Sequence, residues 1–291
     1  MQGLIRKAIA GFYYVEAGSA VYECKARGLL RKKETSPLVG DRVAIEPTGD
    51  GVGVIDEVLP RVNQFGRPPV ANLDQLAVVA SICEPKANPL LMDRMIALAE
   101  DRQVEPLVVL TKNDLLDAQE LAGRYRLAGI PTFCVCCPTG EGIGPLREQL
   151  EGRVTAFCGN TGVGKSSLLN ALDPTLALST GEISQKLGRG RHTTRHVELF
   201  PLASGGYLAD TPGFSSLDSL EGETISKENL AFAFREFVPY LGKCRFTSCS
   251  HTGEKGCAVA QAVEAGSIDP GRYENYVLMY QQARTIKEWE K

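Results

Sequence analysis

The stretch "RVTAFCGNTGVGKSSLLNAL" (153–172) decides the fold, because it joins an apolar strand to a helix through a glycine-rich turn. The turn reads Gly-x4-Gly-Lys-Ser, which is the Walker A pattern in its proper strand–loop–helix context. Its backbone N–H groups can wrap phosphates, Lys165 can reach the β- and γ-phosphates, and Ser166 can bind Mg²⁺. The candidate nucleotide-binding residues of this loop are Gly159, Asn160, Thr161, Gly162, Val163, Gly164, Lys165, Ser166 and Ser167.

A second motif, "TKND" (111–114), follows the apolar run "PLVVL" (106–110) and therefore lies at the carboxyl end of a predicted strand. Ligands of open α/β sheets bind at that edge. The carboxylate of Asp114 can accept hydrogen bonds from guanine N1–H and the 2-amino group, which adenine cannot offer in that arrangement. Lys112 can lay its stem along the base, although so short a pattern also fits an ordinary polar turn. The candidate guanine-binding residues are Thr111, Lys112, Asn113 and Asp114.

Two more segments could supply ligands for the metal ion that accompanies a nucleoside triphosphate. In "YLADTPGF" (207–214) a strand ends at Asp210, which would hold Mg²⁺ through water, and Gly213 would face the γ-phosphate. The segment "GRGRHTTRH" (188–196) would add a threonine hydroxyl to the metal. The candidate magnesium ligands are Ser166, Thr193, Thr194 and Asp210.

The order of these motifs is unusual for a guanine-nucleotide-binding domain. The base loop (111–114) and a second base loop at "CCPTGEGI" (136–143) precede the phosphate loop, which ordinarily comes first. A site is an arrangement in space, so a chain can be cut and rejoined where its termini lie close together. The sequence therefore predicts a circularly permuted domain with an intact sheet.

The rhythm of the chain predicts three domains. Residues 1–68 show short alternating β runs with frequent turn signals, which favours a small β-barrel. Residues 69–220 alternate strand and helix patterns, which is typical of a mainly parallel sheet. In 221–291, the stretches 226–244 and 269–291 have helical spacing on either side of a Cys/Gly-rich segment.

The bulk composition is that of an ordinary globular protein, with 43% hydrophobic residues and a net charge of −3 over 291 residues. No apolar run reaches the roughly 20 residues that a membrane span needs. The N-terminus is broken by charge and glycine too early for a signal peptide. Six of the nine cysteines fall in apolar runs as expected of free thiols, so we expect a cytoplasmic protein without membrane partners, for which a monomer suffices.

The remaining cysteines form a cluster with a histidine, in the spacing Cys-x4-Cys-x-His-x5-Cys. Three thiolates and one imidazole make a closed tetrahedral zinc set with no open position, which predicts one structural Zn²⁺. The segment has little apolar surface of its own, so the metal would supply its folding free energy. Loose thiols or a redox sensor are the alternatives. The candidate zinc ligands are Cys244, Cys249, His251 and Cys257.

The catalytic residue does not follow from the usual GTPase motif. Many GTPases place Gln after the glycine that faces the γ-phosphate, but Phe214 stands there, and its side chain cannot orient water. We therefore expect slow intrinsic turnover that a partner accelerates. His192 is the candidate for orienting water and His196 is second, while a surface or RNA-facing histidine is an equal alternative.

Two basic runs suit phosphate contacts with RNA. The run "KARGLLRKK" (25–33) carries five cations and no acid, and the stretch 184–196 adds four more. Such runs are also common on merely solvated faces.

Taken together, these motifs resemble the ribosome small-subunit-dependent GTPase A (RsgA, YjeQ or YloQ) family over nearly the whole chain. The resemblance rests on "LVGDRVAIEP", "NLDQLAVVAS", "GNTGVGKSSLLNAL", "GRGRHTTRH", "DTPGF" and the Cys/His cluster. It implies a multidomain α/β protein with an N-terminal OB-fold, a central circularly permuted P-loop GTPase domain and a C-terminal helical zinc-binding domain. It also implies hydrolysis of GTP to GDP and phosphate, stimulated by the small (30S) subunit, in late maturation of that subunit.

The same resemblance implies GTP, GDP, the 30S subunit and its 16S rRNA as partners, with other assembly factors as further candidates. The sequence departs from the family pattern at Thr111, where Asn is usual, and at Cys136–Cys137, where a Ser-Ala pair is usual. Two rival interpretations remain. One is a metabolic P-loop kinase or ATPase, and the other is an RNA-binding assembly protein that uses GTP only as a binding switch.

Overall fold

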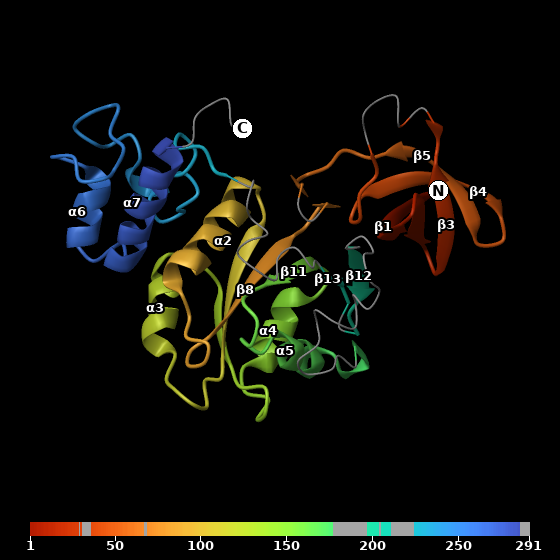
Figure 1. The fold of residues 1–291 in the computed structure, drawn as a ribbon, viewed down its shortest axis with the longest axis horizontal. Coiled ribbons are helices and arrows are strands. Elements are labelled where there is room, and N and C mark those ends of the chain that lie inside the picture. The colour runs from red at the N-terminus through yellow and green to blue at the C-terminus, as the bar shows by residue number, and fades with distance from the viewer. Residues whose placement is uncertain are drawn as a thin grey trace.

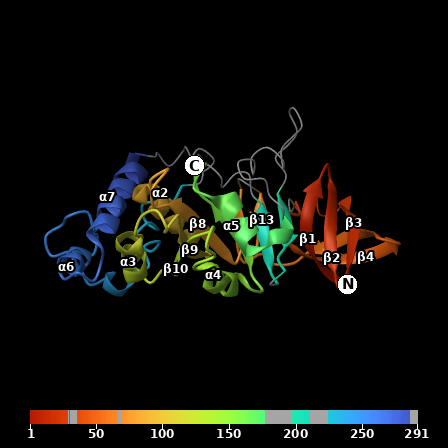
Figure 2. The ribbon, with the colours of Figure 1, turned by 90° about the horizontal axis from the view of Figure 1, so that it is seen from below.

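The computed structural model describes residues 1–28, 30, 36–66, 69–176, 197–203, 205–210 and 224–285. It has a β-barrel at one end, an α/β domain in the middle and a helical region at the other end (Figure 1). The view from below shows the same linear order (Figure 2). Within the described ranges, no helix combines the length and apolarity needed to cross a membrane. The predicted boundaries at 68 and 220 fall outside the described residues and stay predictions.

The N-terminal barrel closes on itself. Its strands are hydrogen-bonded in the order β1-β2-β3-β5-β4, and β4 returns to pair with β1. Only β3 and β5 run parallel. Alternate residues such as Ile5, Val15 and Ile55 point inward and are fully buried, as the period-two pattern predicts. The strands are β1 (Gln2–Ile9), β2 (Phe12–Ala17), β3 (Ala20–Ala26), β4 (Arg42–Gly49) and β5 (Val52–Val58). The predicted OB-like barrel is confirmed.

The central sheet has the order β10-β9-β8-β11-β13-β12. Five strands are parallel and β12 is antiparallel to β13. The strands are β8 (Gln75–Ser81), β9 (Glu105–Thr111), β10 (Thr132–Val135), β11 (Val154–Cys158), β12 (Glu198–Pro201) and β13 (Tyr207–Asp210). A short hairpin of β6 (Gln64–Phe65) and β7 (Val70–Ala71) connects barrel and sheet.

Helices cover both faces of this sheet (Figure 1). Side chains of α2 and α3 pack into one core with the barrel, and those of α4 and α5 into a second core on the other face. Asn88 caps the N-terminus of α2, because its side chain accepts from Leu91 N at 3.3 Å. Pro89 fits the first turn because its missing N–H costs nothing there. The helices are α2 (Pro89–Asp101), α3 (Gln119–Leu127), α4 (Ile143–Leu150) and α5 (Lys165–Leu172).

Barrel and sheet are joined edge to edge, because β1 pairs with β12 at Lys7 and Glu198. The two side chains form a 2.7 Å ion pair. Arg6 adds a hydrogen bond from Nε to Leu199 O at 3.3 Å. The barrel is thus continuous with the strand that follows residues 177–196.

The C-terminal region packs on α2 through a core of aromatic rings. Phe234, Phe237 and Tyr276 lie with ring centroids 4.9–5.3 Å apart. Its elements are the 3₁₀ helix η3 (Val238–Tyr240), α6 (Ala258–Glu264) and α7 (Pro270–Thr285). The predicted helix over 226–244 is instead a series of turns that includes η3, although it buries the face that helical spacing indicates.

A buried ion cluster fastens this region to the central domain. Arg272, on α7, donates from Nη1 to Asp93 of α2 at 2.6 Å and from Nη2 to Glu236 at 3.1 Å. Its side chain is 1% exposed, and Asn275 Nδ2 also donates to Asp93 at 2.6 Å. Arg235 makes a second, half-buried link to Glu100 and Glu105. Helix α2 therefore carries the C-terminal region as well as one face of the sheet.

Candidate nucleotide site and metal centre

The parallel strands bring the predicted base and phosphate loops to one edge of the sheet. The carboxyl ends of β8, β9, β10, β11 and β13 meet there. The loops that follow them contain "TKND" (111–114), the second base loop (136–143) and the phosphate loop (159–164). Motifs that are inverted in the chain are thus neighbours in space, as a circular permutation requires.

The phosphate loop has the backbone that its glycines permit. Gly159 has φ 145°, and a Cβ there would lie 2.2 Å from Val79 O. Gly164 has φ 91° and caps the first turn of α5. Lys165 Nζ donates to Gly159 O and, at 3.3 Å, to Asn160 O. Burial lowers the pKa of Lys165, because it disfavours the charged ammonium. A bound anion would stabilise that charge more than the two backbone carbonyls do.

The base loop is tied to the phosphate loop through a buried hydroxyl. Thr111, 1% exposed, donates from Oγ1 to Val163 O at 2.6 Å. Lys112 has φ 62° and donates from Nζ to Glu84 O. Asp114 is exposed at the end of this loop. Within the tetrad, Thr111 is therefore a buried anchor and Asp114 offers an accessible carboxylate.

The second base loop directly follows β10, which pairs with the strand that ends at Thr111. Burial raises the pKa of the Cys137 thiol, and the charges of Cys136 and Asp114 raise it further. Asn113 N donates to Val135 O at 3.4 Å, immediately before this loop. The two segments that the sequence assigns to the base are therefore adjacent.

Sequence reasoning missed a third loop at this edge, residues 82–88 after β8. It contains the cis peptide Glu84–Pro85, and Pro85 Cδ lies 3.3 Å from the Cβ position of Gly162. Behind it is a cavity of about 30 Å³ between α2 and the phosphate loop, lined in part by Met92, Met95 and Cys158. The signal available in the sequence was a proline-rich turn, "CEPKANP" (83–89), directly after a buried strand.

Most of the other predicted nucleotide and magnesium residues lie outside the described residues: His192, Thr193, Thr194 and Gly213, together with His196 and Phe214. Strand β13 does end at Asp210, beside the strand that leads into the phosphate loop, but the placement of its carboxylate is also outside that description.

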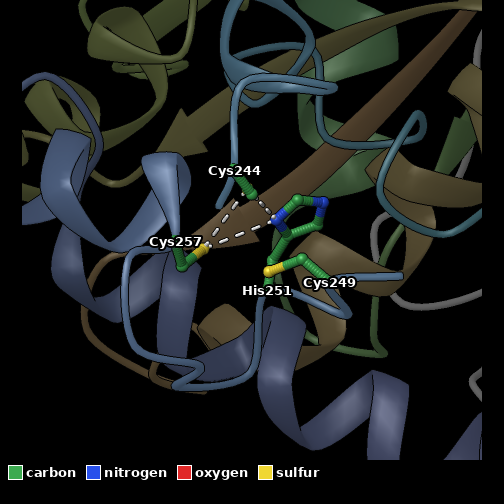
Figure 3. Close-up of side chains that lie close together, drawn as sticks. All are labelled: Cys244, Cys249, His251 and Cys257. Atoms are coloured by element: carbon green, nitrogen blue, oxygen red, sulfur yellow. Dashed lines mark hydrogen bonds between the residues drawn. The ribbon is translucent and has the colours of Figure 1, made fainter. Parts of the chain in front are cut away.

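The four predicted metal ligands converge in the C-terminal region (Figure 3). Their ligand atoms all lie within 4.8 Å of one another. Cys244 Sγ is 3.4 Å from His251 Nδ1 and 4.0 Å from Cys257 Sγ, and Cys257 Sγ is 3.5 Å from His251 Nδ1. Tetrahedral zinc with bonds of about 2.0–2.3 Å needs edges of about 3.5–3.8 Å between ligands. The donor set and its spacing therefore fit a metal ion.

The surrounding residues orient these ligands. Ala258 N donates to Cys244 Sγ at 3.3 Å, and Ala260 N donates to Cys257 Sγ at 3.5 Å at the start of α6. Glu254 accepts from Ser250 N at 2.7 Å and Thr252 N at 2.8 Å, on either side of His251. Burial works against the charge of Glu254, but hydrogen bonds from Ser250 and its neighbours outweigh it and lower the pKa to about 2.

The Cys/His cluster is also connected to α7. Tyr276 Oη, on α7, donates to Ser250 O at 2.7 Å. His251 has φ 59°, a strained conformation for a non-glycine residue. Burial raises the pKa of the Cys249 thiol to about 12, so a cation would have to displace its proton to create a thiolate ligand.

Comparison with known proteins agrees with this geometry. The RsgA GTPase family model matches residues 58–220, and the RsgA N-terminal domain model matches residues 2–55. The small ribosomal subunit biogenesis GTPase RsgA of Caldanaerobacter subterraneus subsp. tengcongensis is 45% identical over 294 residues, which cover 100% of this chain and 97% of the relative. The protein of the same name from Moorella thermoacetica is 46% identical and covers 95% of each chain.

Solved structures match over the same length. The crystal structure of YjeQ from Thermotoga maritima superimposes with a TM-score of 0.82 at 34% identity, covering 98% of this chain and 99% of the other. YloQ, described as a circularly permuted GTPase, gives a TM-score of 0.82 at 35% identity, covering 98% and 96%. The fold is thus shared over nearly the whole chain with a protein described as circularly permuted, and the chain belongs to the RsgA family of GTPases.

Proposed function

We propose that this protein binds GTP, hydrolyses it to GDP and phosphate, and does so while bound to a maturing small ribosomal subunit. The observation that carries the proposal is the meeting of the base and phosphate loops at one sheet edge, joined by the 2.6 Å hydrogen bond from Thr111 to Val163. The printed names of relatives that cover the whole chain support the ribosomal part.

The loops would share the nucleotide between them. The N–H groups of residues 159–167 would hold the α- and β-phosphates, and Lys165 would exchange its backbone carbonyls for phosphate oxygens. Asp114 would accept from guanine N1–H and the 2-amino group. An adenine there would leave an acceptor without its donors, so the proposal includes preference for GTP over ATP.

Magnesium would be held by Ser166, Asp210 and Thr193 or Thr194, and it would neutralise charge on the β- and γ-phosphates. The chain has Phe214 where other GTPases place a water-orienting Gln. We therefore propose slow intrinsic hydrolysis, with His192 orienting water once a partner completes the site.

The C-terminal cluster would hold one structural zinc ion through Cys244, Cys249, His251 and Cys257. The close approach of three sulfurs and one imidazole nitrogen supports this assignment. Four protein ligands leave no position for a substrate, so the ion would act on folding alone.

Contact with the subunit and its 16S rRNA is proposed for both end domains. In the barrel's basic run, Arg27 already pairs with Glu46 and Asp56, so less of its charge is available to RNA than the sequence indicates. Lys25 lies 4.8 Å from the Phe12 ring centroid and stays near the surface.

One assay tests the proposal and its rivals. Phosphate release is measured from GTP and from ATP, with and without purified small subunits. We expect GTP hydrolysis that rises with added subunits, and little ATP hydrolysis. Preference for ATP would favour a metabolic P-loop enzyme, and tight GTP binding without stimulated hydrolysis would favour a binding switch.

A further inference from the structure

One hydroxyl of α7 reaches the loop that carries the predicted metal ligands. Tyr276 Oη donates to Ser250 O at 2.7 Å, which is the length of a strong O–H···O bond. Tyr276 is only 1% exposed, so little water competes for this bond. Ser250 lies between two of the four predicted ligands, Cys249 and His251. The tyrosine is therefore not a ligand, but it holds the backbone that connects two of them.

The peptide that Tyr276 holds also sets the backbone of His251. The C=O of Ser250 and the N–H of His251 belong to one planar unit. Rotation of that unit changes the φ angle of His251, which is 59° and lies in the left-handed region that a non-glycine residue adopts at a cost. A hydrogen bond that fixes this unit therefore stabilises a strained conformation that the loop would otherwise tend to leave.

The peptides on either side of this one are held by Glu254. Its carboxylate accepts from Ser250 N at 2.7 Å and from Thr252 N at 2.8 Å. These N–H groups belong to the peptide that precedes Ser250 and the peptide that follows His251. Three consecutive peptides around the histidine are thus each held by a side chain, the outer two by Glu254 and the middle one by Tyr276. Only the tyrosine comes from outside the loop of ligands.

The tyrosine ring is itself fixed by packing. The ring of Tyr276 lies edge-on to those of Phe234 and Phe237, with centroids 5.3 and 4.9 Å away. About one turn earlier on the same helix, Arg272 donates to Asp93 of α2 at 2.6 Å. The hydroxyl therefore stands on a helix that is anchored to the central domain, and little freedom remains to be lost when it binds the carbonyl.

From this we infer that Tyr276 is a positioning residue for the metal centre. Its hydroxyl holds the backbone of His251 in the conformation that places Nδ1 3.4 Å from Cys244 Sγ and 3.5 Å from Cys257 Sγ. The inference rests on the structural zinc ion proposed above. It makes the metal affinity of the loop depend on a helix residue 26 positions beyond the carbonyl that it binds.

The test uses the full chain and two measurements. Competition with a chromophoric chelator gives the affinity for Zn²⁺, and the visible spectrum of the Co²⁺-loaded protein reports the geometry around the ion. Tyr276→Phe removes the hydroxyl and keeps the ring. The matched control is Tyr280→Phe, about one turn further along α7, with its ring centroid 6.1 Å from that of Tyr276. Phe237→Leu is a second control, because it disturbs the same aromatic packing without removing the hydroxyl.

We expect Tyr276→Phe to bind Zn²⁺ about tenfold more weakly, at the lower end of the effect of residues that orient metal ligands, because it acts through a peptide. Its Co²⁺ bands should also shift. Tyr280→Phe should match the unaltered protein in both measurements, and Phe237→Leu should leave the Co²⁺ spectrum unchanged. The inference is overturned if Tyr276→Phe binds Zn²⁺ normally, or if Phe237→Leu alters the spectrum as much as Tyr276→Phe does. If the unaltered protein binds no Zn²⁺, the proposed metal centre itself has failed, and the inference fails with it.

Discussion

Replacing Arg272 with Met should loosen the C-terminal region from the central domain. The guanidinium is 1% exposed and bridges Asp93, which is fully buried, to Glu236. It also lies 5.0 Å from the Phe234 ring centroid. Removing one partner of a buried ion pair costs about 3–5 kcal/mol, because the other charge is left unpaired in a low dielectric. Asp93 keeps its bond from Asn275, so we expect about 3–4 kcal/mol.

The stability lost in Arg272→Met should depend on pH. Burial raises the pKa of Asp93, and Arg272 and Asn275 pull it back. Without Arg272 the pKa rises further, so the folded variant favours the protonated acid. A group with a raised folded pKa contributes stability at low pH that is lost as pH rises through that pKa. The difference in unfolding free energy between Arg272→Met and the unaltered protein should therefore be smaller at about pH 5 than at about pH 8.

Hydrogen exchange of the α7 amides measures this local stability, since opening of one region need not unfold the rest. A loss of about 3–4 kcal/mol speeds exchange by roughly two to three orders of magnitude. The control is Arg124→Met, because the Arg124–Asp269 pair at 3.0 Å is about one quarter exposed and should contribute less than about 1 kcal/mol. The reasoning would be refuted if the α7 amides exchanged equally fast in Arg272→Met and Arg124→Met. It would also be refuted if Arg272→Met exchanged no faster than the unaltered protein.

Three further outcomes are expected. Gly159→Ala should abolish GDP binding in calorimetry, because the new Cβ would lie 2.2 Å from Val79 O; retained binding would mean that this loop does not hold phosphate. Asp114→Ala should weaken GTP binding by about 10–150-fold, the range for hydrogen bonds to a charged group, and leave weak ATP binding unchanged in a competition assay. Chelation of metal should remove hydrogen-exchange protection from α6, as should Cys249→Ser, and added Zn²⁺ should restore it only in the unaltered chain; protection that survives chelation would contradict a structural metal.

Local patterns predicted the architecture well. The barrel, the permuted parallel sheet and the Cys/His cluster each follow from signals carried within short stretches, such as period-two alternation or ligand spacing. The segment 226–244 shows where this fails. Its apolar spacing predicts a helix, but tight turns bury the same face, because packing against α2 and α7 requires only that face and not a regular backbone.

Long-range pairings were beyond sequence reasoning. The partner of Arg272 is 179 residues away at Asp93, and the charge of either residue by itself suggests a solvated surface. Thr111 was expected in the base site on the strength of its motif. Its hydroxyl faces Val163 because strand pairing sets its direction, and strand order cannot be seen from the tetrad.

Because β1 pairs with β12, a movement of the barrel is transmitted mechanically to the central domain. Strand β12 starts two residues after His196, where the segment with the threonines assigned to magnesium ends. Torsion of the barrel must either carry this strand with it or break the Lys7–Glu198 pairing. An RNA surface that bound the barrel would thereby pull, through a single strand, on the segment to which we assign the magnesium-binding threonines.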